Sequence, residues 1–139
     1  MGTGSGGEEP AETGGASGRA TPRVRITLET GLRIGPGKID LLEAIEAAGS
    51  ISAAGGGLGM SYRRAWRLVD ETGRIFRRPV VVASAGGARG GGARLTEFGR
   101  ALVAAYRRIE ARAARIVQEE LAPFDRDFAP VDRAAREED

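Results

Sequence analysis

Residues 49–70 run Gly49-Ser-Ile-Ser-Ala-Ala-Gly-Gly-Gly-Leu-Gly-Met-Ser-Tyr-Arg-Arg-Ala-Trp-Arg-Leu-Val-Asp70, a pattern that predicts two short helices joined by a tight turn. Gly59 is placed to make the turn, and Ser61 is placed to cap the second helix. Three arginines fall in the first two turns of that helix: Arg63, Arg64 and Arg67. A capped helix N-terminus that carries positive charge is typical of the DNA-contacting helix of a helix-turn-helix.

A glycine-rich basic segment follows about 20 residues later: Ala85-Gly-Gly-Ala-Arg-Gly-Gly-Gly-Ala-Arg-Leu-Thr96. Residues 84–92 form the predicted loop between two predicted strands, 80–83 and 93–95, so the strands and loop together predict a hairpin in the place of a wing. Glycines allow such a hairpin to approach a sugar-phosphate backbone closely. The alternative is a hairpin tip whose arginines are simply solvated.

The remaining segments complete a recognisable order of elements. We expect a strand over 23–28, a turn and a return strand over 32–34, a helix from Pro36 to Gly49, and a long helix capped by Thr96 that ends near Leu121. The predicted fold class is mainly α with a small β-hairpin wing. The order is that of a winged helix-turn-helix with a long C-terminal helix.

Length and charge suggest how the 139 residues are organised. Residues 1–22 are rich in Gly, Ser, Thr, Glu and Ala and are predicted to be a disordered tail, 23–122 the folded domain, and 123–139 an acidic tail. Residues 60–115 carry a net charge of +9, whereas 119–139 carry −5. This separation favours a polyanionic partner for the basic part. An arginine-biased composition would explain the scarcity of lysine, but not the separation of signs.

Several classes of function are excluded by composition. The chain has no cysteine and no histidine, so we expect no thiolate chemistry, no metal site built on these residues, no cofactor and no enzymatic activity. No apolar run approaches the ~20 residues needed to span a membrane. The N-terminus lacks the apolar stretch of a signal peptide, and the expected location is cytoplasmic.

Specific runs of residues resemble the N-terminal domain of ModE-type molybdate-responsive regulators. They are 49–54, Leu58-Gly-Met-Ser-Tyr-Arg-Arg-Ala-Trp-Arg-Leu-Val69, Gly86-Gly, Gly90-Gly-Gly-Ala-Arg-Leu-Thr-Glu-Phe-Gly99 and Tyr106. The resemblance covers roughly residues 23–118. It implies a homodimer that binds a palindromic operator and acts mainly as a repressor. Full-length members carry C-terminal oxyanion-binding domains, whereas we expect this chain to resemble a stand-alone form without them, so a molybdate response by this chain alone is not expected.

The candidate DNA-binding residues are Ser50, Ser52, Ser61, Tyr62, Arg63, Arg64, Arg67, Arg89 and Arg94. The first-turn residues of the second helix are expected to meet base edges, and arginine can bind guanine through two hydrogen bonds. The two serines of the first helix are expected either to hold a phosphate or to act only as caps. The alternative for the arginines is a solvated face paired with Asp70 and Glu71.

Four further expectations concern packing. Apolar residues of the long helix are predicted to form a stripe that includes Phe98, Leu102, Ala105, Ile109 and Ile116. Trp66 is predicted to lie in the core, and is therefore left out of the candidate site. The carboxylates Asp40, Glu43 and Glu46 are predicted to form a solvated helix face. The run 55–57 contains three glycines, each costing ~1 kcal/mol against alanine in a helix, so the first helix of the motif is expected to be soft.

The sequence therefore predicts a sequence-specific regulator that binds an inverted repeat in double-stranded DNA as a homodimer, without membrane association. The link to molybdate or a related oxyanion rests on the resemblance alone. The alternative function is a protein-interaction module that joins a separate sensor or complex through its long helix and acidic tail.

Overall fold

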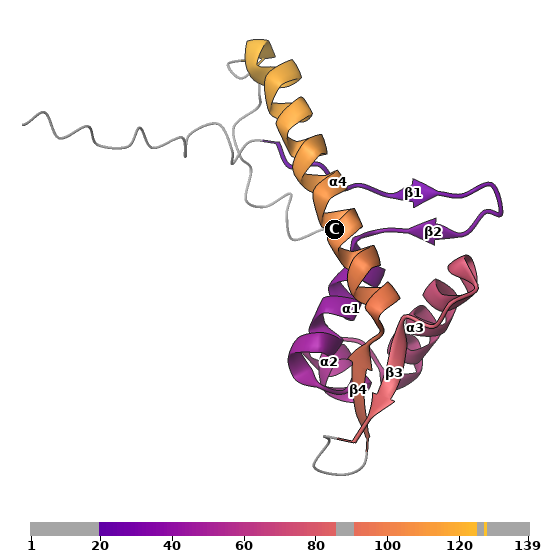
Figure 1. Ribbon diagram of the computed structural model, residues 1–139. Coiled ribbons are helices and arrows are strands. Elements are labelled where there is room, and N and C mark those ends of the chain that lie inside the picture. The colour runs from indigo at the N-terminus through magenta and orange to yellow at the C-terminus, as the bar shows by residue number, and fades with distance from the viewer. Residues whose placement is uncertain (1–19, 86–90, 125–126, 128–139) are drawn as a thin grey trace, which may run out of the picture. The chain divides into compact units, whose positions relative to one another are not determined.

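The structure is a computed structural model that describes residues 20–85, 91–124 and 127. Its elements are β1 (Ile26–Thr27), β2 (Arg33–Ile34), α1 (Pro36–Ala48), α2 (Ile51–Gly57), α3 (Tyr62–Phe76), β3 (Val81–Ser84), β4 (Gly92–Leu95), α4 (Glu97–Leu121) and a 3-10 turn (Ala122–Phe124), shown in Figure 1. Antiparallel pairing joins β1 to β2 and β3 to β4. The predicted order and fold class are confirmed: the chain is a winged helix-turn-helix. Residues 23–112 form one compact unit.

Side-chain caps set the boundaries of the helix-turn-helix. Ser50 Oγ accepts a hydrogen bond from the Ala53 amide at 3.1 Å, so Ser50 and not Ser52 caps α2. Ser61 Oγ likewise accepts from the Arg64 amide at 3.2 Å and starts α3. Gly59 makes the turn between these helices with a φ of 70°, a left-handed conformation that favours glycine. The turn therefore fixes where the N-terminus of α3 is presented.

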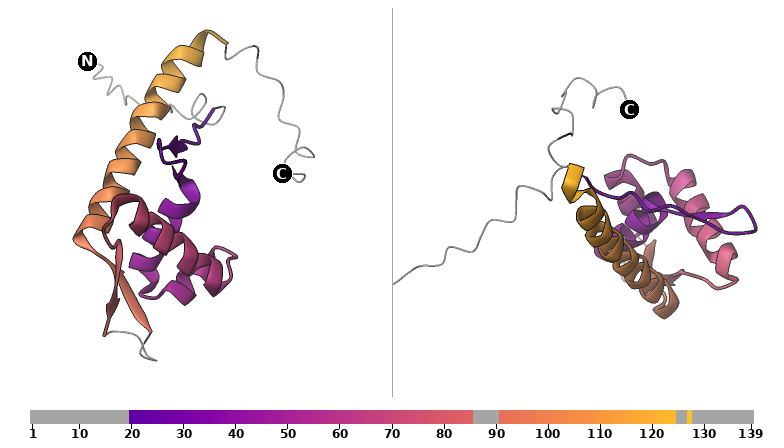
Figure 2. Two further views of the ribbon diagram at one scale, coloured as in Figure 1. Left: turned by 90° about the vertical axis from the view of Figure 1, so that its right-hand side faces the viewer. Right: turned by 90° about the horizontal axis from the view of Figure 1, so that it is seen from above.

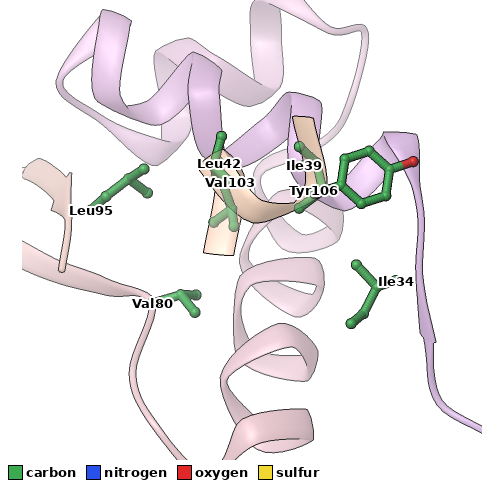
Figure 3. Packing of buried hydrophobic residues seen from close by; sticks show 7 residues of the cluster. All are labelled: Ile34, Ile39, Leu42, Val80, Leu95, Val103 and Tyr106. Atoms are coloured by element: carbon green, nitrogen blue, oxygen red, sulfur yellow. The ribbon is translucent and has the colours of Figure 1, made fainter. Parts of the chain in front are cut away.

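The principal core joins α1 and α4 to both strand pairs, and Figure 3 shows its buried members: Ile34, Ile39, Leu42, Val80, Leu95, Val103 and Tyr106. The Tyr106 hydroxyl donates a hydrogen bond to the Val24 carbonyl, which ties α4 to the segment before β1. Burial raises the pKa of Tyr106 above its ordinary value, so the hydroxyl keeps its proton for this bond. A second cluster holds α1, α2, α3 and β4 together through Leu41, Ile45, Ala54, Ala65 and Ala93.

The face of α4 that packs against the core differs in part from the predicted apolar stripe. Its buried residues are Gly99, Val103 and Tyr106, whereas the predicted stripe members Ile109 and Ile116 are 42% and 59% exposed. The reason is that glycine at position 99 permits close contact with the Val80 backbone just before β3, which turns that side of the helix inward. Phe98, Leu102 and Ala105 are half-buried at the edge of the core.

The carboxylates of α1 lie on a largely exposed face, as predicted, with Glu43 and Glu46 exposed and Asp40 half-buried, but they also form ion pairs that the sequence did not predict. Arg107 of α4 pairs with Glu43 and Asp40 of α1, each at 2.8 Å, and with Glu110 at 2.7 Å. Hydrogen bonds to Glu43, Asp40 and Glu110 raise the pKa of Arg107, which stays charged. Glu46 accepts a hydrogen bond from the Leu95 amide at 2.8 Å. The acidic face of α1 thus holds α4 and β4, a long-range pairing that helical spacing could not reveal.

Gly55 meets a packing requirement between α2 and α3. It is buried, and an added Cβ would lie 2.9 Å from the Cβ of Ala65 on α3, whereas a Cβ at Gly56 would meet open space. Within the part of the chain that the structure describes, no helix is long and apolar enough to cross a membrane.

We expect Gly55→Ala to lower the free energy of unfolding by about 1–3 kcal/mol, because it forces α2 away from α3. The control Gly56→Ala should raise it by up to ~1 kcal/mol through helix propensity. Urea unfolding of both variants checks this prediction. Equal stability of the two variants would show that the two helices do not pack closely at Gly55.

Candidate DNA interface

The first two turns of α3 separate a buried side from a basic side. Ala65 and Thr72 are buried, and Thr72 Oγ1 donates to the Leu68 carbonyl at 2.7 Å. Arg63 and Arg67 lie one helical turn apart on the exposed side, and Arg64 is exposed as well. Packing of the inward residues against α1 and α2 therefore fixes the direction in which the arginines project.

These arginines carry charge that no described carboxylate neutralises. Among the described residues, no ion pair within 4.0 Å involves Arg63, Arg64 or Arg67. The two carboxylates that could have neutralised them pair elsewhere: Asp70 with Arg74 at 2.8 Å, and Glu71 with Lys38 at 3.5 Å. The alternative of a face paired with those carboxylates is thus not observed. A row of positive charge at a helix N-terminus suits a phosphate-bearing ligand.

The β3–β4 hairpin supplies the second part of the candidate interface. Its strands extend beyond the level of α2 and α3 (Figures 1 and 2). Arg94 lies exposed on β4 opposite Val82, and Arg89 falls outside the described residues. Ser50 is occupied as the cap of α2, while Ser52 is exposed near the start of the same helix. The structure thus brings the α3 arginines and the wing strands to one part of the fold, and gives Ser50 a structural role.

Trp66 does not lie in the core, and its predicted position is wrong. Its side chain is 51% exposed, and Tyr62, one turn earlier, is 59% exposed. The inward direction of α3 runs through Ala65, Leu68 and Thr72, which leaves Trp66 at the edge facing the hairpin. The four-residue spacing of the two aromatic residues was the signal that sequence reasoning missed, since it places both beside the arginines.

Cavities flank Trp66 on either side. One of about 280 Å³ lies between α3 and the hairpin, lined among others by Tyr62, Val82 and Ala83. Another of about 490 Å³ lies between the C-terminal half of α3 and β3. Among the residues that the structure describes, no group of three or more potential ligands could hold a metal ion. The exposed indole therefore borders an open groove between α3 and the hairpin.

Curated relatives match most of this chain. They include the molybdenum-pterin-binding protein MopB of Rhodobacter capsulatus (44% identity, 75% of this chain, 38% of the relative) and the molybdenum transport protein ModE of Azotobacter vinelandii (40%, 66% and 34%). The DNA-binding transcriptional dual regulator ModE of Escherichia coli K12 is 35% identical over 60% of this chain and 32% of its own. The chain thus spans little more than a third of the length of these relatives. No protein-family model matches it.

Solved structures agree on the fold. The CbnR_DBD–DNA complex superposes with a TM-score of 0.51 at 23% identity, covering 63% of this chain and 94% of that one. Full-length CbnR complexed with its target DNA gives a TM-score of 0.50 at 24% identity, covering 62% and 28%. Taken with the sequence matches, the resemblance is confirmed: this winged-helix chain is similar to ModE-type regulators over about a third of their length.

Proposed function

We propose that this chain is a sequence-specific DNA-binding transcription regulator that places the N-terminal turns of α3 in the major groove. The observation that carries the proposal is the exposed arginine row behind the Ser61 cap, which has no ion-pair partner among the residues that the structure describes. Relatives named as transcriptional regulators support it. The proposed DNA-binding unit spans residues 23–122, with tails 1–22 and 123–139 on either side.

Each candidate residue has a proposed role on the duplex. Arg63 and Arg67 contact base edges, with Arg64 and Tyr62 beside them, because they lie in the turns that a recognition helix inserts. Phosphates are contacted by the Ser61 region, Ser52 and the wing arginines. These contacts set the register of the protein on DNA. We propose that the regulated genes act in the metabolism of molybdenum or a related oxyanion, because the relatives' names refer to molybdenum. The proposed mode of regulation is repression.

The functional form is proposed to be a homodimer on an inverted repeat. Ile109 of α4 is 42% exposed and Ile116, seven residues later, is 59% exposed, which an adjoining α4 would cover. Two recognition helices would then lie roughly 34–36 Å apart, one turn of DNA.

Ile109→Glu is expected to convert a dimer into a monomer, because a buried unpaired carboxylate opposes association. Sedimentation velocity measures the change, and Arg108→Ala on the neighbouring exposed face serves as the control. A wild-type protein that sediments as a monomer at micromolar concentration, alone and on DNA, would contradict the dimer.

The function is tested by selecting genomic fragments with the purified protein and following their binding against salt. Recovery of a shared inverted repeat, bound with a steep salt slope, is the expected result. Weak binding without sequence preference would overturn the proposal. It would favour the alternative, a protein-interaction module.

A further inference from the structure

Tyr62 and Trp66 form an aromatic edge along the basic face of α3. Both are more than half exposed, and together they line the groove of about 280 Å³ between α3 and the hairpin. The hairpin side of this groove is apolar, with Val81, Val82 and Ala83. Large exposed apolar side chains that border a groove commonly mark a contact surface.

The occupant of this groove must present apolar and anionic groups side by side. Arg63 and Arg67 flank the aromatic edge, and within the described residues they have no carboxylate partner. A nucleic-acid duplex offers both features, since its phosphates lie next to the C5-methyl group of thymine in the major groove. That methyl group is the apolar feature that marks thymine in the major groove, so an aromatic side chain can recognise it through apolar contact.

We propose that Trp66, assisted by Tyr62, is a specificity-determining residue that recognises thymine methyl groups in the bound DNA. The inference rests on the proposed function and deepens it, because it assigns base preference to the aromatic edge as well as to the arginines. Arginine favours guanine through O6 and N7, whereas the indole ring favours thymine through apolar contact. The site therefore combines two kinds of base recognition on adjacent positions of one helix.

The test uses a duplex that the wild-type protein selects from a random double-stranded library. The duplex is synthesised once with thymidine and once with 2′-deoxyuridine at the same positions, a change that removes only the methyl groups. Affinities are measured for the wild-type protein, Trp66→Ala, Trp66→Phe and Arg63→Ala, after circular dichroism has verified that each is folded. Trp66→Phe keeps an aromatic ring without the indole N–H, so it separates methyl contact from a hydrogen bond to phosphate.

The wild-type protein is expected to bind the thymidine duplex about fourfold more tightly for each methyl group it contacts, the amount expected from burying one such group. Trp66→Ala should lose this preference, while Trp66→Phe and Arg63→Ala should retain most of it. Equal wild-type affinity for both duplexes, full preference in Trp66→Ala, or a selected site without thymine would overturn the inference while leaving DNA binding intact. Failure to select any duplex would instead overturn the proposed function, and the inference with it.

Discussion

Replacing Arg63 and Arg67 together with alanine is expected to weaken binding to a selected duplex by about 30-fold to 10⁴-fold. Each arginine that forms two hydrogen bonds to a base contributes about 1–3 kcal/mol of discrimination, and both lie exposed in the first two turns of α3. If either arginine binds a phosphate instead, its removal should lower the slope of log affinity against log salt by about one. Fluorescence anisotropy at several salt concentrations measures both quantities.

A control with the same reduction of charge distinguishes a local effect from general attraction. Arg108 and Arg115 are exposed on α4, away from α3 in sequence, and their double alanine variant should change affinity by only a few fold. Similarly weakened binding in both double variants would mean that net charge, not the α3 face, controls binding.

Gly99→Ala is expected to lower the free energy of unfolding by about 3 kcal/mol or more, the largest stability change we expect from one added methyl group. An added Cβ would lie 2.2 Å from the Val80 carbonyl oxygen, a backbone atom that cannot rotate away. The same oxygen accepts a hydrogen bond from the Thr96 amide at 2.9 Å, so a shift would also disturb the start of α4. The melting temperature should fall by roughly 12 °C or more.

Gly37→Ala is the matched control, because it makes the same chemical change in α1 where an added Cβ meets nothing within 4 Å. Thermal unfolding should show it as stable as the wild-type protein or slightly more stable. A Gly99→Ala protein with an unchanged melting temperature would contradict the close approach of α4 to the Val80 backbone.

Local rules predicted most of the fold. Ser61 and Thr96 begin their helices as predicted, and Gly49, with a φ of 78°, ends α1. Such signals act within a few residues, so they are visible in a single sequence. The helix-turn-helix and the wing followed from these boundaries and from the position of the glycines.

The features that could not be predicted depend on how separate segments pack against one another. Asp40 and Glu43 lie on a partly exposed face, as predicted, but their pairing with Arg107, more than 60 residues later, was not predicted. Trp66 looks like a core residue because of its size, but Ala65 occupies the buried position and the indole lies at the edge. The close approach of Gly55 to Ala65 was likewise not predicted. Spacing gives the face of a helix, but tertiary packing decides what covers that face.

The central claim is that the N-terminal half of α3 and the β3–β4 hairpin form the DNA-binding surface. The most direct test is to map amide chemical shifts of the labelled protein while a selected duplex is added. We predict the largest shifts at residues 61–67 and on β4 near Arg94, with small shifts along the acidic face of α1. Large shifts confined to α1 and α4, with α3 unchanged, would contradict this account.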